Sequence, residues 1–333
     1  MSGRAWLVTW AVLLAVLLPC GNGGCRSRPG SPAGRGRRNQ SDANRRCRQL
    51  NADGNHYSMT GQYDSAIACY RRALRLAIDS SLDNRAAASC QNLGIAFEAL
   101  GQRDSADHFY AMARSYTDTS SMADKNMSAS VLMNHAAFLI VKSREQTDSA
   151  RCFAKLDTAR SELEQALALT RKTAARFDEA SIAYNLGVVL ATLGRDDSAY
   201  ALFSAALVAY GRDPAVDGQA QTLSALGKIL FSHGAFDSAE KVMKRAVALA
   251  PHVTEKVTAG HIIADLGTIF GEIGNYPAAR ECFEQALEIY QRTNQPGAAE
   301  EMNANLLLLD ILQSLRPDKP RSPEQHFKWH DKS

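Results

Sequence analysis

The residues of this chain that could do chemistry are few, and they form no recognisable reaction centre. His326 and His330 lie four residues apart near Trp329, a spacing that can hold a metal ion on one face of a helix. They stand in a segment without hydrophobic periodicity and without a further ligand, so we expect no metal there. The sequence contains no glycine-rich phosphate loop, no nucleophile elbow and no HExxH motif. It therefore predicts a protein that is not an enzyme and that uses no cofactor and no metal.

The seven cysteines include no CxxC pair. Cys69 and Cys282 share one position of a repeated pattern, and Cys90 falls at a helix-packing position of the same pattern. Buried thiols are common in helical cores, so we favour the interpretation that these cysteines are free core residues. If the body of the chain is exported, an odd thiol is unusual, and a disulfide between Cys69 and Cys90 is the alternative.

The tripeptide Asp-Ser-Ala occurs five times and organises the chain. Its copies begin at Asp64, Asp104, Asp148, Asp197 and Asp237, and Pro277-Ala278-Ala279 is a degenerate sixth copy. We expect the Asp and Ser side chains to cap the first amides of five helices, and Pro277 to suit the first position of a sixth. A glycine precedes most copies, where a helix that ends needs a left-handed residue; these are Gly61, Gly101, Gly194, Gly234 and Gly274.

A second set of small residues falls inside the helix that precedes each tripeptide: Gly54, Gly94, Ala136, Gly187, Gly227 and Gly267. Glycine inside a helix costs about 1 kcal/mol relative to alanine, so its recurrence indicates a close approach of two helices. Four of the five spacings are near 40 residues, and the longest separates Ala136 from Gly187. The third repeat is thus irregular, which is typical of a change in superhelix curvature and equally of a neutral insertion.

This pattern resembles the tetratricopeptide repeat, in which W-x2-L-G-x2-Y is followed by A-x3-F. Gly54, Tyr57, Ala66 and Tyr70 carry the resemblance in the first copy, and it covers roughly residues 47–290. It implies an all-α fold, a right-handed α-solenoid of about six helical hairpins within residues 47–315.

The end of this array and the tail that follows it can also be predicted. Residues 298–315 place Met302, Leu306, Leu309 and Leu312 at helical spacing, and we expect this helix to cap the array with one polar face. Residues 316–333 lack periodicity and are expected to form a disordered tail.

The resemblance further implies that the first helix of each hairpin lines a concave, peptide-binding groove. Two residues before the small position of that helix stand Asn92, Asn134 and Asn185, with Asp265 in the last repeat. A carboxamide both donates and accepts hydrogen bonds, so such a row could hold the backbone of an extended peptide, as an Asn at this position does in related 40-residue repeats. The groove would also contain Lys228, Phe231 and Glu98. The alternative is that the Asn side chains bond only the adjacent helix.

The N-terminal residues 1–25 are typical of an export segment. Residues 1–25 begin with Arg4 and continue with an apolar run from Ala5 to Leu18, which is long enough for a signal peptide and short for a spanning helix. Leu17-Leu18-Pro19-Cys20 resembles a bacterial lipobox, and this makes Cys20 a candidate for lipidation and the protein a membrane-associated lipoprotein of the cell envelope. Residues 26–46 are rich in arginine and predict a disordered, basic tether. Because basic residues beside an apolar segment tend to stay in the cytoplasm, an N-terminal anchor with cytoplasmic repeats is the alternative.

Charge and composition narrow the class of function. The net charge of +3 hides a basic N-terminal segment and a repeat body, residues 49–315, of about −7. Since no aromatic residues are interspersed among the arginines, we expect no nucleic-acid partner. The sequence predicts a membrane-tethered scaffold for protein–protein interaction, or else a sensory component that acts through a separate output protein. The oligomeric state cannot be inferred from these features.

Overall fold

The described part of the chain is all-α. The structure is a computed structural model, and it describes residues 32–118, 125–144, 148–171, 176–211 and 215–315. In these ranges every regular element is a helix, and there is no strand. The predicted signal segment, with Cys20, and the tail, with His326 and His330, lie outside the described residues.

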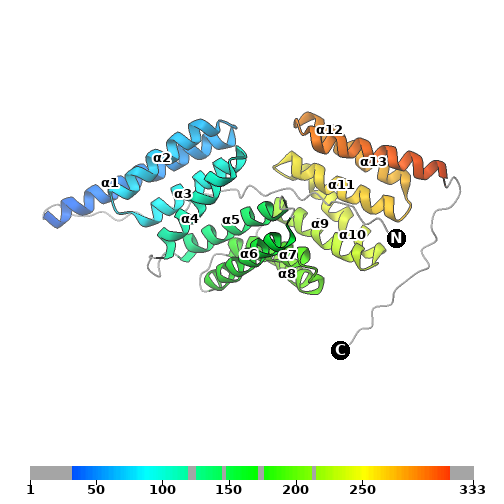
Figure 1. Cartoon of the computed structure of the whole chain (residues 1–333), viewed down its shortest axis with the longest axis horizontal. Helices are drawn as coiled ribbons and strands as arrows, with labels where there is room; N and C mark the ends of the chain where they lie inside the picture. The colour runs from blue at the N-terminus through cyan, green and yellow to red at the C-terminus, as the bar shows by residue number, and fades with distance from the viewer. Residues whose placement is uncertain (1–31, 119–124, 145–147, 172–175, 212–214, 316–333) are drawn as a thin grey trace, which may run out of the picture. The chain divides into compact units, whose positions relative to one another are not determined.

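The helices alternate along the chain as the two members of successive hairpins (Figure 1). The first helices, called A helices below, are α1 (Pro32–Met59), α3 (Asp83–Ala99), α5 (Lys125–Arg144), α7 (Arg176–Thr192), α9 (Val216–Ser232) and α11 (Lys256–Glu272). The second helices, called B helices, are α2 (Tyr63–Asp79), α4 (Arg103–Asp118), α6 (Ser149–Thr170), α8 (Asp196–Tyr210), α10 (Phe236–Leu249) and α12 (Tyr276–Arg292). A short 3-10 helix, η2 (Ala250–His252), follows α10, and α13 (Pro296–Leu315) follows the sixth hairpin.

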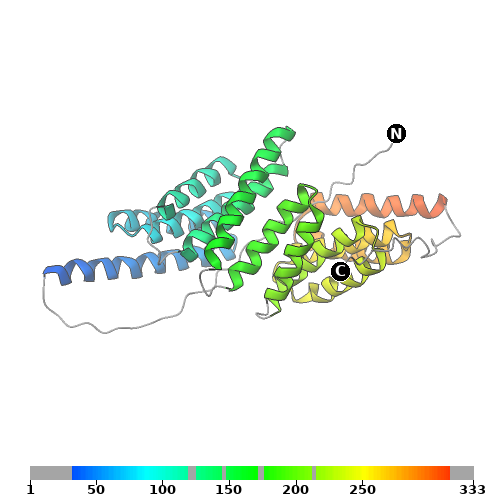
Figure 2. The ribbon, with the colours of Figure 1, turned by 90° about the horizontal axis from the view of Figure 1, so that it is seen from below.

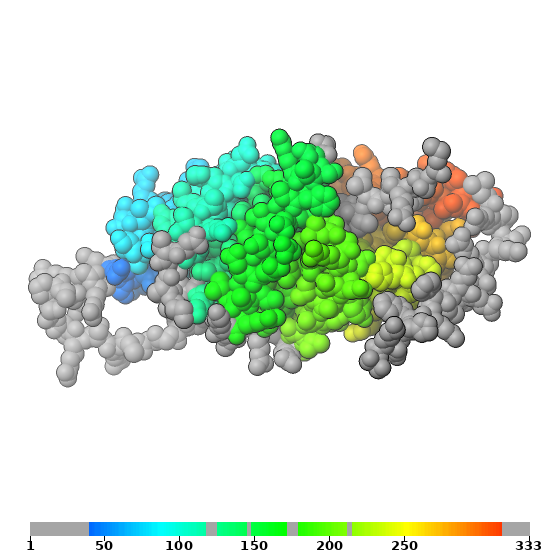
Figure 3. Space-filling model, turned by 60° about the horizontal axis from the view of Figure 1, so that its bottom comes forward, coloured from blue at the N-terminus to red at the C-terminus, as the bar shows by residue number. Residues whose placement is uncertain are grey.

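The chain divides into two compact units, whose border falls between Asp178 and Glu179. The N-terminal unit holds α1 to α6 and the first three residues of α7, which end at Asp178. The C-terminal unit holds the rest of α7 and the helices from α8 to α13. In the N-terminal unit the side chains of α4, α5 and α6 form one continuous surface, coloured from cyan to green (Figure 3). The border follows the third repeat, the irregular one in the sequence.

The turns between A and B helices confirm the role predicted for the first set of glycines. Gly61, Gly101, Gly194, Gly234 and Gly274 all have φ between 70° and 84°. At the first turn the amide of Gln62 bonds the carbonyl of Tyr57 at 2.9 Å, which closes the helix end around the left-handed glycine.

The prediction that Asp and Ser cap the B helices holds at only one of the five tripeptides. Asp148 accepts a hydrogen bond from the amide of Ala150 at 2.9 Å. At α2, α8 and α10 the capping residues are Gln62, Arg195 and Ala235, and none of them caps through its side chain. The glycine turn already places the next residue as the cap, so the aspartates lie in the first helical turn. There their negative charges stabilise the helix by interacting favourably with the positive end of its dipole.

The second set of glycines does mark close helix packing, as predicted. A Cβ on Gly54 would lie 2.4 Å from the ring of Tyr70, and one on Gly187 would lie 2.6 Å from the ring of Phe203. At Gly227 the nearest atoms belong to Met243, also at 2.4 Å. The residue that fills the space against each glycine therefore comes from the B helix of the same hairpin.

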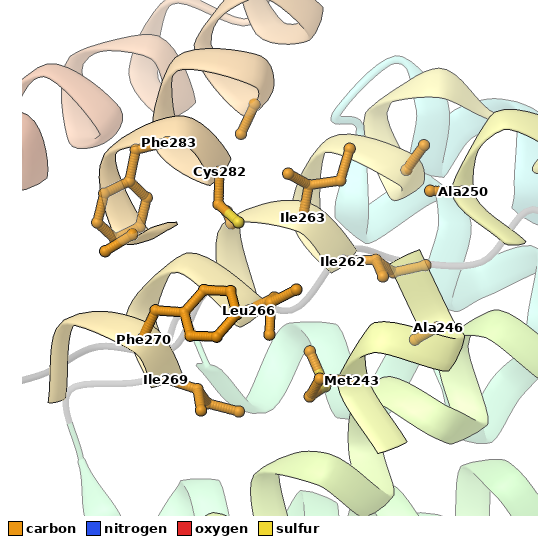
Figure 4. Close-up of a cluster of buried hydrophobic side chains, with 14 of the residues drawn as sticks. Met243, Ala246, Ala250, Ile262, Ile263, Leu266, Ile269, Phe270, Cys282 and Phe283 are labelled. Carbon is orange, nitrogen blue, oxygen red and sulfur yellow. The ribbon is translucent and has the colours of Figure 1, made fainter. Parts of the chain in front are cut away.

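The core of the C-terminal unit shows how successive hairpins join. Met243 from α10, Ile262, Leu266 and Ile269 from α11, and Phe283 from α12 belong to one buried cluster (Figure 4). Helix α11 thus packs both on its own B helix and on the hairpin before it, which is the packing that lets hairpins stack.

Helix α1 begins earlier than the sequence indicated. It starts at Pro32 and extends past α2 (Figure 2), so the prediction of a disordered tether over residues 26–46 is wrong for residues 32–46. Ala43 and Cys47 are buried, and Asn44 accepts a hydrogen bond from Arg85 on α3 at 2.6 Å. These contacts anchor the last part of the segment, and arginine is itself a good helix former.

The third Asp-Ser-Ala copy does not mark the packing position that its siblings mark. The buried series Ala66, Tyr70, Ala73 and Ala77 of α2 has the same spacing as Ala159, Leu163, Ala166 and Thr170 of α6. Ala150 lies nine residues before Ala159 and is exposed. The tripeptide at Asp148 therefore opens an N-terminal extension of α6, which accounts for the long third spacing.

Candidate functional site

Polar side chains of neighbouring A helices bond one another in the N-terminal unit. The amide of Asn51 on α1 donates to Ser89 on α3 at 3.0 Å, and Asn92 donates to Asn51 at 3.3 Å. Gln91 on α3 donates to Ser130 on α5 at 3.2 Å. Asn92 is 7% exposed, so its amide is engaged within the protein. For this residue the geometry favours the alternative of the sequence analysis, a bond to the adjacent helix.

In the C-terminal unit the corresponding contact is ionic. Lys228 on α9 and Asp265 on α11 form an ion pair with 2.5 Å between Nζ and Oδ2. Ser224 donates to the same carboxylate oxygen at 2.8 Å. The side chains of Lys228 and Asp265 are 19% and 18% exposed, so the pair is within reach of a ligand. The structure thus brings two of the predicted site residues together.

Two further polar groups lie beside this ion pair. His261 is near enough to Asp265 and Lys228 for both charges to affect it, and its ring packs 5.3 Å from that of Tyr290. Burial is the main cause that lowers the pKa of His261 below its usual value of 6.5. Gln221, 9% exposed, occupies on α9 the place that His261 occupies on α11. The atoms Oε1 of Gln221 and Nδ1 of His261 are buried without a hydrogen-bond partner among the described residues.

The other predicted residues are scattered. Asn134 on α5 is 9% exposed, and Asn185 on α7 is half-buried. These two lie in different units, so no continuous row from Asn92 to Asn185 is described. Phe231 packs its ring 5.3 Å from that of Phe236. Glu98 accepts a hydrogen bond from the hydroxyl of Tyr110 at 3.1 Å, and burial raises the pKa of its carboxyl above 4.5.

A buried ionic cluster in the N-terminal unit was missed by the sequence analysis. Glu162 on α6 is 1% exposed, and Arg114 on α4 donates to its Oε1 at 2.7 Å. Nδ1 of His135 on α5 lies 3.0 Å from the same oxygen. On the other side of the imidazole, Nε2 is 3.8 Å from Asp107, which also pairs with Lys142.

These three ionisable residues stand where the other repeats are apolar, except that the first repeat has Asp53 at the position of His135. Glu162 occupies the place of Cys69, Phe109, Leu202, Val242 and Cys282; His135 that of Leu93, Leu186, Leu226 and Leu266; and Arg114 that of Leu74, Leu207, Val247 and Leu287. The signal was available in the sequence, but the third tripeptide had set α6 in the wrong register. A buried ion pair is weak support for stability, and this one joins α4 of the second hairpin to α5 and α6 of the third.

The described side chains form no metal-binding cluster. Among the described residues there is no group of three or more His, Cys, Asp or Glu that could hold a metal ion. Cys47, Cys69, Cys90, Cys152 and Cys282 are all free, so Cys69 and Cys90 do not form a disulfide here. Burial raises the pKa of Cys90 to about 12 and that of Cys282 to about 11, which makes both thiols poor nucleophiles. Within the same residues no helix is long and apolar enough to cross a bilayer.

Comparison with protein families finds three tetratricopeptide repeat models. They match residues 50–82, 178–252 and 261–297. These matches fall in both units and include the α9–α11 region that holds Lys228 and Asp265. A search of curated protein sequences finds no match to this chain.

Solved structures share the fold at low sequence identity. BtubC (BKLC) from P. vanneervenii is 17% identical, with a TM-score of 0.53 over 90% of this chain and 99% of that one. A STAND protein with a tetratricopeptide repeat sensor from Pyrococcus horikoshii is 13% identical, with a TM-score of 0.60 over 83% of this chain and 41% of that one. A Rap protein complexed with competence and sporulation factor is 13% identical, with a TM-score of 0.54 over 85% and 81%. At these identities the likeness concerns the fold alone, and the three family matches show that this all-α chain contains tetratricopeptide repeats within residues 50–82, 178–252 and 261–297.

Proposed function

We propose that the chain is a non-enzymatic interaction scaffold that holds a partner peptide against the A helices of its C-terminal unit. The observation that carries this proposal is the polar cluster on α9 and α11, where the Lys228–Asp265 pair is partly exposed and the buried carbonyl oxygen of Gln221 has no partner within the described part of the chain. A buried acceptor that is left unbonded costs about 1–3 kcal/mol, and a donor from a ligand would remove that cost.

The chemistry of the cluster suits a peptide. A backbone amide could donate to the Gln221 oxygen after the side-chain amide turns outward, and a backbone carbonyl could accept from Lys228. Asp265 and Lys228 would in addition favour a segment that carries both a basic and an acidic side chain. The solved Rap structure is a complex with competence and sporulation factor. A protein of similar fold thus binds such a factor, which supports the proposal by analogy.

A library selection tests this proposal. The immobilised full-length chain is exposed to short random peptides displayed on phage, and the affinity of each enriched peptide is measured by fluorescence anisotropy. We expect Lys228→Ala and Asp265→Ala each to weaken binding about tenfold or more, equivalent to about 1.4 kcal/mol. Lys244→Ala is the matched control, because Lys244 is 60% exposed and pairs with Glu240 on the same helix.

The outcomes separate the proposed site from its alternatives. Unchanged binding in Lys228→Ala and Asp265→Ala would exclude the α9–α11 cluster as the site. In that case the triple variant Asn92→Ala, Asn134→Ala and Asn185→Ala tests the row predicted from the sequence. If the wild-type chain enriches no peptide at all, the proposal of a peptide-holding scaffold is wrong.

We also propose that the N-terminal segment tethers this scaffold to a membrane through a lipid on Cys20. The apolar run of residues 5–18 and the lipobox-like residues 17–20 support it. Metabolic labelling with an alkyne fatty acid should mark the wild-type protein in a bacterial host and leave Cys20→Ser unlabelled, with Cys25→Ser as the control. Equal labelling of wild type and Cys20→Ser would remove Cys20 from this role, and labelling of neither would reject the lipoprotein.

A sensory role is the second candidate. The likeness to a sensor of tetratricopeptide repeats in a STAND protein and to Rap proteins favours it, although it concerns the fold alone. In that case the selected peptide must change the affinity of the chain for a separate output protein. A simple scaffold would bind the peptide without such coupling.

A further inference from the structure

Helix α13 stacks on α11 in the register in which α11 stacks on α9. The three helices begin at Val216, Lys256 and Pro296, so each starts 40 residues after the one before. Leu309 of α13 belongs to the same hydrophobic cluster as α11 and lies 3.7 Å from where a Cβ on Gly271 would be. Each position of α13 therefore has an equivalent 40 residues earlier on α11 and 80 residues earlier on α9.

The exposed surface of α13 carries both apolar and acidic side chains. The sequence predicted a polar outer face for this helix, but Leu307 and Ile311 are 61% and 47% exposed. Three side chains of α13 are charged, and all of them are acidic: Glu300, Glu301 and Asp310. Asp310 pairs with Arg280 of α12, whereas Glu300 and Glu301 are exposed near the start of the helix.

One register of the three stacked helices places polar groups around Tyr290 of α12. This register holds Gln221 on α9, His261 on α11 and Glu301 on α13. The ring of His261 lies 5.3 Å from that of Tyr290. Burial, and then the negative charges of Asp265 and Glu301, raise the pKa of the Tyr290 hydroxyl. Both carboxylates therefore lie near this one hydroxyl, and Glu301 belongs to the same neighbourhood as the Lys228–Asp265 pair.

The charge of this neighbourhood favours a cation. Lys228 already compensates Asp265, which also accepts a hydrogen bond from Ser224. Glu301 adds a further negative charge at an exposed position. Over residues 215–315 the chain carries 12 acidic and 7 basic side chains, so the wider field has the same sign.

The unpartnered group of the cluster also asks for a donor. Oε1 of Gln221 is buried without a hydrogen-bond partner in the described ranges, and the residue is 9% exposed. This atom and the carboxylate oxygens are acceptors. The ammonium of lysine and the guanidinium of arginine only donate, so a basic side chain matches the set.

We propose that the ligand is a peptide with a basic side chain, Lys or Arg, that Glu301 binds beside Asp265. The inference rests on the proposed function, because it specifies the ligand of the same site. It extends that site from two helices to three, since Glu301 lies on α13. Glu301 is thus the residue that selects among peptides, while the α9–α11 cluster holds them.

The width of the three helices sets the length of the ligand. Packed helices lie about 8–10 Å apart, so the axes of α9 and α13 are separated by about 16–20 Å. An extended chain advances about 3.3 Å per residue, so about five or six residues cover this span. Shorter peptides should not reach both Lys228 and Glu301.

The random-peptide selection on the full-length chain also tests this inference. We expect the wild type to enrich Lys or Arg at one position, and Glu301→Gln to weaken the enriched peptides about three- to tenfold in fluorescence anisotropy. Replacement of that basic residue by Gln should weaken binding to the wild type by a similar factor. It should not change binding to Glu301→Gln, because in that variant the interaction is already absent.

Glu288→Gln on α12 is the matched control. The Glu288 side chain is 70% exposed and pairs with Arg292 on its own helix, so this variant removes a negative charge from the same unit without touching the site. It should bind the enriched peptides as the wild type does. Thermal unfolding of Glu301→Gln should match that of the wild type, because Glu301 is exposed.

The outcomes separate this inference from the proposed function. Peptides that require Lys228 and Asp265 but lack a basic residue, and that bind Glu301→Gln as well as wild type, overturn the inference and leave the proposed site in place. A basic residue whose replacement weakens binding equally in wild type and Glu301→Gln has its partner elsewhere, which also overturns it. If no peptide is enriched at all, both proposals are wrong.

Discussion

At the scale of single residues, the buried cluster of Glu162, His135 and Arg114 is the feature that most separates one repeat from its siblings. Charged groups inside a core are costly to desolvate, and their attraction recovers that cost only when every partner is in place. Glu162 is 1% exposed, whereas the Arg114 side chain is 40% exposed. Removal of the carboxylate therefore leaves a cation that can partly reach water.

A mutant cycle measures what the cluster contributes. Glu162→Leu alone should lower the free energy of unfolding by about 2–4 kcal/mol, because it strands Arg114 and His135 against an apolar side chain. The triple variant Glu162→Leu, His135→Leu and Arg114→Leu restores residues that other repeats carry, and should recover most or all of that loss. Urea denaturation, followed in parallel by hydrogen exchange in α5 and α6, reports both changes.

The control for this cycle is Glu164→Gln. Glu164 is on the same helix and is bonded to Arg160, but its side chain is 52% exposed. It should change the free energy by less than about 0.5 kcal/mol. A triple variant no more stable than Glu162→Leu would show that the cluster is a net stabiliser rather than a specificity device.

At the scale of helices, the contact between an A-helix glycine and a B-helix ring fixes how tightly each hairpin closes. Gly187→Ala should destabilise the C-terminal unit by about 1–3 kcal/mol, because the added Cβ would lie 2.6 Å from the buried ring of Phe203. Gly227→Ala should stay within about 1 kcal/mol of the wild type. There the obstacle is the flexible Met243, and alanine gains helix propensity.

The chain itself supplies a rescue for Gly187→Ala. In the third hairpin the same two positions are Ala136 and Leu163, both fully buried. Gly187→Ala combined with Phe203→Leu copies that pair and should be more stable than Gly187→Ala alone in thermal unfolding. If the double variant is no more stable, the ring of Phe203 is not the obstacle.

How far the sequence predicts this fold depends on whether a feature is local. The turn glycines are dictated by backbone geometry at their own positions, and the helix-internal glycines by a contact with the B helix that recurs at one position of the repeat; both sets were identified correctly. The start of α1 depends on contacts of Ala43 and Asn44 with helices that follow in the chain, so composition alone indicated disorder. In α6 the tripeptide at Asp148 is a true cap but opens an extension, and only packing distinguishes that from a hairpin start.

The candidate site was predictable in part for the same reason. The pairing of Lys228 with Asp265 joins positions 37 residues apart, which the repeat length brings to neighbouring A helices. The engagement of Asn92 by Asn51 was one of two alternatives, because the register places both side chains on neighbouring A helices but does not decide whether they bond each other or a ligand.

At the scale of the whole molecule, the two units should respond to pH in opposite directions. In the N-terminal unit burial raises the pKa of Glu98 above 4.5, so the folded state binds that proton more tightly than the unfolded chain. The resulting stability is fully present below the unfolded pKa and is lost as the pH rises through the folded pKa. Acidification toward 4.5 should therefore stabilise this unit through Glu98.

The C-terminal unit carries the contrary case in His261. Burial is the main cause that lowers its pKa below 6.5, so the folded state binds this proton less tightly than the unfolded chain. The stability that it contributes is present above the unfolded pKa and is lost as the pH falls through the folded pKa. Acidification below 6.5 should destabilise this unit, whatever Glu98 does in the other.

Hydrogen exchange with peptide resolution separates the two effects, after correction for the intrinsic exchange rate at each pH. Between pH 6.5 and 4.5 we expect protection in α3 and α4 to rise relative to Glu98→Gln, and protection in α11 and α12 to fall relative to His261→Gln. Glutamine is a matched replacement at His261, because Gln221 occupies the equivalent place on α9. A shift in the same direction in both units, or one that persists in these variants, would mean that other groups control the pH response. The opposite shifts would instead give each unit its own pH range of stability, since Glu98 and His261 titrate inside separate cores.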